Sequence, residues 1–196
     1  MNLLIFGPQG AGKGTQAARI AHEYGIPHIA TGEMLRAAIA AGSDLGRRVK
    51  AVVERGDLVT DALMIELIRD RLAVPDASEG FVLDGFPRTL AQAEALDVLL
   101  DEIGRPLDGV LVLEVPDDVA RRRMARRAEV EGRADDTPEV IANRLSTYHE
   151  QTAPLVEWYR ARDKVAPVDG TQDFAPPSAS RTGLAAGLVS SALPCS

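Results

Sequence analysis

The chain has 196 residues, of which 45% are hydrophobic and 26% charged, and its formal net charge is −7. This length suits one domain that buries roughly 70% of its unfolded surface. The only cysteine, Cys195, excludes an internal disulfide and a cysteine-based zinc site. The acidic balance argues against a nucleic-acid-binding surface, and we find neither a membrane-length apolar run nor a signal peptide. We therefore expect a cytoplasmic protein without nucleic-acid or membrane partners.

Short apolar segments alternate with amphipathic ones along the chain. Candidate strands lie at 3–6, 81–83 and 110–113, each bounded by Gly, Pro or Asp. Weaker strand candidates lie at 26–30 and 165–168. Helical periodicity covers 61–73 and 89–103, and Thr137-Pro138 opens a further helix that Pro154 kinks or divides. Continuous apolar strands between helices are typical of a parallel sheet covered on both faces. The pattern predicts a three-layer α/β/α domain over 1–196 with about five parallel strands.

Three segments depart from this alternation. Residues 31–60 carry helical signals without a convincing strand, which predicts a small helical insert. Residues 125–136 are polar and predict a short mobile loop. Residues 174–196 are rich in Ala, Ser, Gly and Pro and form an atypical tail, although Leu184, Leu188, Val189 and Leu193 have the spacing for a short helix.

The strongest motif is the glycine-rich segment Gly7-Pro8-Gln9-Gly10-Ala11-Gly12-Lys13-Gly14-Thr15-Gln16, between the first strand and a helix. Its glycines allow the backbone to wrap around phosphates, and a helix N-terminus favours anions. Lys13 can reach the β- and γ-phosphates, and the hydroxyl of Thr15 can bind Mg²⁺, although Gly14 separates the two where the generic pattern has none. A turn that binds nothing is the alternative, which four glycines and the lysine disfavour. We assign the phosphates of a nucleotide to Gly10, Ala11, Gly12, Lys13, Gly14 and Thr15, although this motif alone does not distinguish kinases, GTPases and ATPases.

A second candidate follows the strand at 81–83, in the run Asp84-Gly85-Phe86-Pro87-Arg88. Asp-Gly is also common in ordinary turns, so the position of this pair after a strand decides between a turn and a binding site. The carboxyl ends of parallel strands meet at one edge of a sheet, where ligands bind. Asp84 could there orient water on Mg²⁺, and the planar guanidinium of Arg88 suits a phosphate.

Together these motifs resemble the adenylate kinase family in its short-lid bacterial form. The resemblance runs in family order over about residues 1–172, through Gly7–Gln16, Thr31–Arg36, Gly56–Val59, Leu83–Arg88, Gly132–Thr137, Asn143–Leu145, Tyr148, Thr152–Leu155 and Val168–Thr171. The family pattern more often has Pro where Gln9 stands. The resemblance implies a P-loop fold in which the insert at 31–60 binds AMP and the loop at 125–136 is a lid. It assigns AMP to Thr31, Gly32, Arg36, Asp57, Val59, Gly85, Arg88, Gln92, Arg133 and Arg144.

Gln92 has two interpretations. Thr89-Leu90-Ala91-Gln92 has the capping-box pattern, which explains Thr89 and Gln92 without a ligand. In the resembling family the Gln at this place hydrogen-bonds adenine, and related pyrimidine-preferring kinases usually carry Asn where Thr89 stands. The resemblance therefore favours AMP over UMP or CMP.

Five arginines crowd the segment 121–127. Helical spacing places Arg122 and Arg126 on one side, and Arg123 and Arg127 on another. The resemblance favours Arg122 and Arg126 as the pair that faces ATP, but a one-residue shift after Pro116 would exchange the pairs.

The resemblance also implies roles for residues further along the chain. Arg133 would close over ATP from the lid, and Arg144 would reach in from the helix that follows. Asp135 and Asp136 would pair with arginines and hinge the loop, and Gly170 would approach the adenine of ATP through its backbone.

The expected reaction is reversible transfer of a phosphoryl group from Mg-ATP to AMP, which gives two ADP. An AMP phosphate is already largely anionic at neutral pH, so no general base is needed. Positioning and electrostatic stabilisation would come from Mg²⁺ and from Lys13, Arg88, Arg126, Arg133 and Arg144. We expect a monomer without zinc, and treat His22, His28 and His149 as structural.

Two alternatives stay open. A kinase for another monophosphate such as UMP or CMP would share the fold and the mechanism. A non-catalytic nucleotide-binding module would share the P-loop, but it has little reason to keep both a donor and an acceptor site. A GTPase would need an Asn-Lys-x-Asp segment, which the sequence lacks.

Overall fold

The computed structural model describes residues 1–131 and 136–171, and its centre is a parallel sheet. The strands are β1 (Asn2–Phe6), β2 (His28–Ala30), β3 (Phe81–Asp84), β4 (Gly109–Glu114) and β5 (Val165–Asp169). Their order is β2-β3-β1-β4-β5, and every pairing is parallel. This confirms the predicted three-layer α/β fold.

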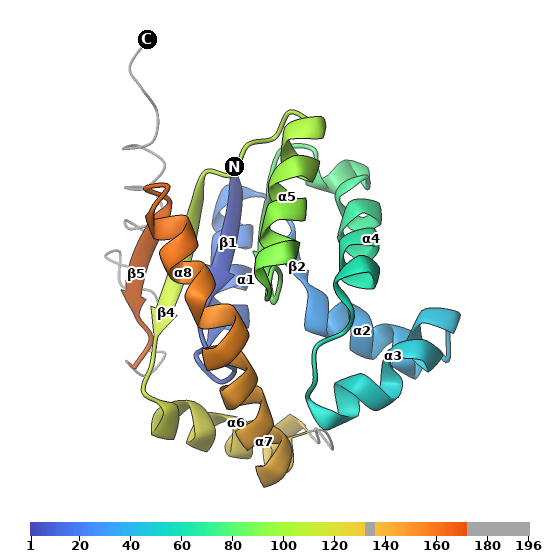
Figure 1. Cartoon of the computed structure of the whole chain (residues 1–196), viewed down its shortest axis with the longest axis vertical. Coiled ribbons are helices and arrows are strands. Elements are labelled where there is room, and N and C mark those ends of the chain that lie inside the picture. Colours follow the sequence, from blue (N-terminus) through green and yellow to red (C-terminus); the bar gives the residue numbers. More distant parts are fainter. Residues whose placement is uncertain (132–135, 172–196) are drawn as a thin grey trace.

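The two faces of the sheet are covered by different helices (Figure 1). Leu4 and Phe6 of β1 belong to a core formed with α4 (Asp61–Leu72), α5 (Leu90–Glu102) and α8 (Ala153–Arg160). Leu3 and Ile5 point to the other face, against α1 (Lys13–Tyr24). Consecutive residues of β1 are therefore all buried, which is why the strand reads as one continuous apolar run.

Four helices extend beyond the carboxyl ends of the strands: α2 (Thr31–Ala40), α3 (Asp44–Arg55), α6 (Asp117–Glu131) and α7 (Pro138–Thr147). The segment 31–60 thus holds two helices and no strand. Helices α2 and α3 lie in close contact at Gly46 of α3. A Cβ at this position would lie only 2.0 Å from the carbonyl oxygen of Ala38 in α2. Asn143 of α7 connects to the end of α3, since its Nδ2 donates to the Arg55 carbonyl and to Asp57 Oδ1, each at 3.0 Å.

The helix that Thr137 opens is divided near Pro154, as predicted. The hydroxyl of Thr137 accepts a hydrogen bond from the Val140 backbone N–H at 3.4 Å. After α7 the chain forms one π-helical turn, η2 (Tyr148–Thr152), in which the N–H of Ala153 bonds to the carbonyl of Tyr148. Proline has no N–H to continue the helical ladder, so this turn separates α7 from α8.

The segment 125–136 differs from the predicted loop. Helix α6 continues through Glu131, so residues 125–131 are helical. Residues 132–135 of the expected lid and all of the 174–196 tail lie outside the described residues. In the described part of the chain, no helix has both the length and the apolar character needed to cross a membrane.

Candidate functional site

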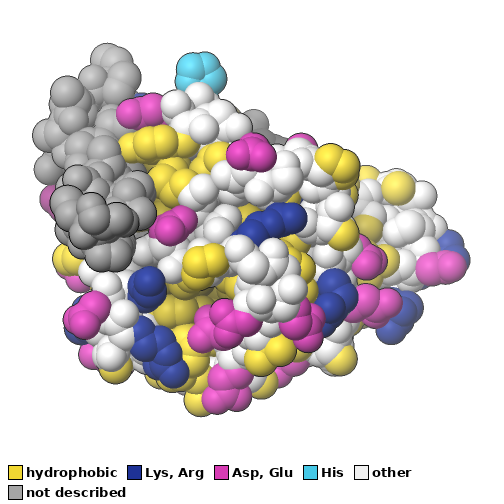
Figure 2. All heavy atoms as spheres, turned by 90° about the horizontal axis from the view of Figure 1, so that it is seen from above, with side chains coloured by type: hydrophobic (Ala, Val, Ile, Leu, Met, Phe, Trp, Pro, Cys, Tyr) yellow, Lys and Arg dark blue, Asp and Glu magenta, His cyan; other side chains and the backbone are white. Residues whose placement is uncertain are grey.

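A cavity of about 770 Å³ lies at the carboxyl ends of the strands, between the glycine-rich loop, α2–α3, α6 and α7. Cationic side chains dominate its lining: Lys13, Arg36, Arg88, Arg123, Arg126, Arg127 and Arg144, against Glu33, Asp57 and Asp84. Over the opposite end of the molecule, acidic and basic side chains are interspersed (Figure 2). An acidic protein thus gathers positive charge in one cavity, as expected for a site that binds polyanions.

The glycine-rich loop enters this cavity in a conformation that requires glycine. Gly10 has φ +83°, and a Cβ there would lie 2.4 Å from the carbonyl oxygen of Ala120 in α6. Gly12, with φ +92°, caps α1 and offers no side-chain hydrogen bond to its first turn. The backbone N–H groups of that turn therefore face the site with the positive end of the helix dipole.

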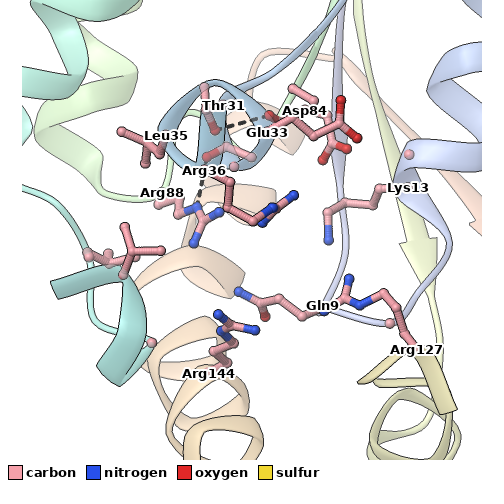
Figure 3. A pocket seen from close by; sticks show the side chains of 18 of the residues that line it. Gln9, Lys13, Thr31, Glu33, Leu35, Arg36, Asp84, Arg88, Arg127 and Arg144 are labelled. Carbon is pink, nitrogen blue, oxygen red and sulfur yellow. Dashed lines mark hydrogen bonds between the residues drawn. The ribbon is translucent and has the colours of Figure 1, made fainter. Parts of the chain in front are cut away.

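Lys13 begins α1 and points into the cavity (Figure 3). Its ammonium group donates to the carbonyl oxygens of Gly7 and Pro8 at 2.7 and 2.9 Å. Burial lowers the pKa of Lys13 to about 8; Asp84 opposes the shift, while the charges of Arg88 and Arg127 add to it. A buried ammonium with cationic neighbours has most to gain from an arriving anion.

Asp84 ends β3 opposite Lys13. Burial alone would raise its pKa, but contact with His28 and the charges of Lys13 and Arg88 outweigh burial and keep the pKa below its usual value. The His28 Nε2 lies 3.6 Å from Asp84 Oδ2, and Thr31 Oγ1 donates to the Asp84 carbonyl at 3.2 Å. Asp84 is therefore a carboxylate at neutral pH.

The donor set fits a Mg²⁺ ion that arrives with a nucleotide. Thr15 and Asp84 both line the cavity and offer the oxygen atoms that Mg²⁺ prefers. Among the described residues, no group of three or more His, Cys, Asp or Glu side chains could hold a metal. Such a sparse set suits an ion that keeps waters and takes its other ligands from phosphates.

Arg88 lies across the cavity from Lys13, on the segment after β3. Its Nε donates to the Gly85 carbonyl at 2.7 Å, which leaves the rest of the guanidinium toward the cavity (Figure 3). Burial lowers the pKa of Arg88, with Arg144 and Arg36 adding to the shift and Asp84 opposing it. Gly85 permits this packing, because a Cβ there would lie 2.7 Å from Thr31 Oγ1. Two separate cationic centres, Lys13 and Arg88, thus face the same space.

One wall of the cavity is apolar and lies beside Arg36 and Gln92. It is formed by Leu35, Val53, Leu58, Val59 and Met64. Of this set only Val59 was assigned to the site from the sequence, because apolar side chains such as Val53 and Met64 are indistinguishable in sequence from ordinary helix core residues. An apolar wall next to a buried amide suits a flat heterocycle.

Helix α6 supplies Arg123, Arg126 and Arg127 to the cavity but not Arg122. Arg122 instead pairs with Asp118 at 2.6 Å on the exposed side. The reason is the fully buried pair Ala120 and Met124, four residues apart, which fixes the rotation of the helix. Arg123 and Arg127 flank that pair, whereas Arg122 lies on the far side. Ala120, directly before the arginine run, and Met124, within it, were the apolar signal that could have resolved the register.

Asp136 joins two of the arginines. Its side chain is fully buried and accepts from Arg127 Nε at 2.9 Å and from Arg127 Nη2 at 2.7 Å. Its other oxygen pairs with Arg144 Nη1. This carboxylate fixes guanidinium groups from α6 and α7 beside one another, in the kind of pairing predicted for it.

Most of the other predicted site residues line the same cavity: Gly10, Gly12, Gly14, Thr15, Thr31, Gly32, Arg36, Asp57, Val59, Gly85 and Gln92. Ala11 and Gly170 do not. Ala11, although part of the loop, is buried in the core beside β1 and α1, and the Gly170 carbonyl accepts from Arg123 Nη1 at 2.7 Å. Arg133 and Asp135 lie outside the described residues.

Comparison with known proteins agrees with this geometry. The family model for adenylate kinase matches residues 5–164. An adenylate kinase of Stenotrophomonas maltophilia (strain R551-3) is 51% identical over 174 residues, which are 89% of this chain and 93% of that protein. An adenylate kinase of Caulobacter vibrioides (strain NA1000 / CB15N) is 52% identical over 170 residues, 87% of this chain and 89% of that protein. One from Xanthomonas campestris pv. campestris (strain 8004) is 51% identical over 170 residues, 87% and 91% of the two chains.

Proposed function

The chain belongs to the adenylate kinase family, and we propose that its cavity transfers a phosphoryl group reversibly between Mg-ATP and AMP. The observation that carries the proposal is one cavity with two cationic centres. Lys13 and the glycine-rich loop lie on one side, and Arg88, Arg36 and Gln92 on the other. A site for one nucleotide does not need the second centre.

The chemistry asks the protein for positioning rather than for a base. The phosphate of AMP has a second pKa of about 6, so its oxygen is already an anionic nucleophile at neutral pH. That oxygen forms a bond to the γ-phosphorus of ATP as the bond from that phosphorus to the β,γ-bridging oxygen breaks, and ADP leaves. Two polyanions must therefore be held in line, and Lys13 and the arginines supply that attraction.

We assign the donor side to the loop from Gly10 to Thr15, with Thr15 and, through water, Asp84 toward Mg²⁺. When bound, Mg²⁺ would offset charge on the phosphates. We assign contact with ATP from α6 to Arg123, Arg126 and Arg127, and the position of all three in the cavity lining supports this. Arg122 does not share that support.

We assign the acceptor side to the segment 31–60 and to the residues after β3. Arg36 and Arg88 would bind the phosphate of AMP, and Arg144 would bridge both nucleotides. The apolar wall and Gln92 would receive the adenine. Transfer also requires exclusion of water, and we assign that role to 125–136 with Arg133.

We further propose a cytoplasmic monomer. The single cysteine supports the cytoplasmic setting. Light scattering after gel filtration tests the monomer, and a dimer mass would contradict it.

The test of the proposed reaction is formation of ADP from Mg-ATP with AMP, UMP, CMP, GMP or no acceptor in parallel. Among these acceptors, we expect rapid ADP formation only with AMP. A preference for UMP or CMP would keep the mechanism and overturn the base assignment. A folded protein that binds ATP but transfers to no acceptor would contradict the proposal and favour a nucleotide-binding module.

A further inference from the structure

The side chain of Gln92 is held at both ends of its amide. It is 1% exposed and lies in the first turn of α5. Its Oε1 accepts a hydrogen bond from the backbone N–H of Arg88 at 2.8 Å, and its Nε2 donates to Asp61 Oδ1 at 2.7 Å. The capping box predicted from the sequence is thus only half formed, because the side-chain oxygen bonds to Arg88 rather than to the N–H of Thr89.

These partners allow one orientation of the amide. A backbone N–H can only donate, and an ionised carboxylate can only accept. Rotating the amide by half a turn would direct its NH₂ at the N–H of Arg88 and its oxygen at the carboxylate of Asp61. Both hydrogen bonds would be lost in a buried place, where unpaired polar groups are costly. The NH₂ group of Gln92, and not its oxygen, therefore stays on the side of the amide that faces Asp61.

Asp61 is itself fixed by a second donor. The hydroxyl of Thr89 donates to the same Asp61 Oδ1 at 3.0 Å and accepts from the backbone N–H of Gln92 at 3.2 Å. Two donors from the start of α5 thus converge on one oxygen from the start of α4. Asp61 does not line the cavity, whereas Gln92 does.

We propose that Asp61 is a positioning residue that makes Gln92 a permanent hydrogen-bond donor, and that this selects 6-aminopurines over 6-oxopurines. The inference rests on the proposed function and deepens it. Asp61 uses one hydrogen of Nε2, and among the described residues the other hydrogen has no acceptor. Adenine offers an acceptor at ring nitrogen N1. Hypoxanthine and guanine carry a hydrogen there, so a fixed donor would meet a donor and leave both unpaired.

The test compares AMP with inosine monophosphate as acceptors, by the ratio of their kcat/KM values. Asp61→Ala removes one of the two hydrogen bonds that fix the amide. Rotation then costs only the bond from the Arg88 N–H, and the rotated amide can offer its oxygen to the N1–H of hypoxanthine. We expect the preference for AMP to fall at least tenfold, with KM for ATP within twofold of the unaltered protein.

Asp61→Asn is the matched control, because it removes the same charge from the first turn of α4 but keeps an oxygen. The two donors that converge on Oδ1 select that oxygen over the new NH₂. We expect this variant to keep the preference for AMP within about threefold. If both variants lose the preference equally, the charge and not the acceptor matters, and the proposal is overturned.

A spectroscopic measurement separates orientation from simple destabilisation. In the unaltered protein and in Asp61→Asn, the side-chain amide protons of Gln92 should exchange slowly with solvent, whereas in Asp61→Ala they should exchange at least tenfold faster. Unchanged exchange and an unchanged AMP preference in a folded Asp61→Ala variant would overturn the inference while leaving the proposed transfer intact. Failure of the unaltered protein to phosphorylate AMP would instead contradict the proposed function itself.

Discussion

The two sides of the cavity are built in different ways. Asp84 is the last residue of buried strand β3, Arg88 lies four residues after it, and Lys13 begins α1 after the glycine-rich loop that follows buried strand β1, so the sheet fixes where this part of the cavity lies. The arginines of α6 lie on a helix that is mostly exposed, and among its described side chains Ala120 and Met124 are the buried ones. The strand-end side is therefore determined by a large core, and the α6 side by two small contacts and one buried carboxylate. Substitutions should affect these two sides differently.

The largest effect should come from the strand-end side. Lys13→Met removes the ammonium group that faces the phosphates, and we expect kcat/KM to fall about 10³-fold, as when other preorganised electrostatic groups are removed. The fold should persist, because within residues 1–131 and 136–171 the hydrogen bonds of Lys13 go to carbonyl oxygens of its own loop. Steady-state kinetics and a thermal melt measure both quantities. Near-normal turnover would refute the assignment of the loop.

On the α6 side, the largest effect on stability should come from Asp136→Ala. It removes the buried carboxylate that joins Arg127 and Arg144, and an uncompensated buried charge is costly. Because the Arg127 side chain is already 26% exposed and can gain water, we expect the free energy of unfolding to fall by about 2–3 kcal/mol. Urea unfolding measures this. A change below about 0.5 kcal/mol would mean that this carboxylate does not hold the two helices.

The rotation of α6 is tested by two neighbouring substitutions. Arg123→Ala removes a cavity-lining guanidinium and should lower kcat/KM for ATP about 10- to 100-fold, the value of one or two charge-assisted hydrogen bonds. Arg122→Ala is the matched control, because its exposed pair with Asp118 contributes little. It should change kcat/KM less than twofold. The reverse order would restore the pair Arg122 and Arg126 favoured by the resemblance.

The smallest expected effect is the change of kcat/KM for ATP with pH close to neutrality. The pKa of Lys13 is lowered to about 8, and only the ammonium form attracts phosphate. Above that pH the free protein loses the proton, so kcat/KM for ATP should fall, approaching tenfold for each further pH unit. Bound phosphates raise the pKa of Lys13, so kcat should hold to higher pH. Profiles between pH 6.5 and 9.5 test this, and parallel kcat and kcat/KM profiles would contradict it.

The sequence allowed more of the strand-end side to be predicted than of the α6 side. The continuous apolar run Leu3–Phe6, followed at once by the glycine-rich segment, is typical of a buried strand before a phosphate-binding turn, so the loop and Asp84 could be placed at one edge of the sheet. The arginine run was harder to assign, because shifting a helix by one residue changes which side chains face inward, and the apolar pair Ala120 and Met124 is the signal that distinguishes the registers. The partner of Gln92 was also missed, since Asp61 is 31 residues away in the chain and no local pattern connects them.

The most direct test of a cavity that holds donor and acceptor together is the fate of the transferred group. ATP labelled in its γ-phosphate is mixed with Mg²⁺, AMP and the protein, and label is counted in ADP and in inorganic phosphate during the first turnovers. We predict that nearly all label appears in the β-phosphate of ADP. Label released mainly as inorganic phosphate, with AMP unchanged, would contradict the account, because it would mean that water and not AMP occupies the acceptor side.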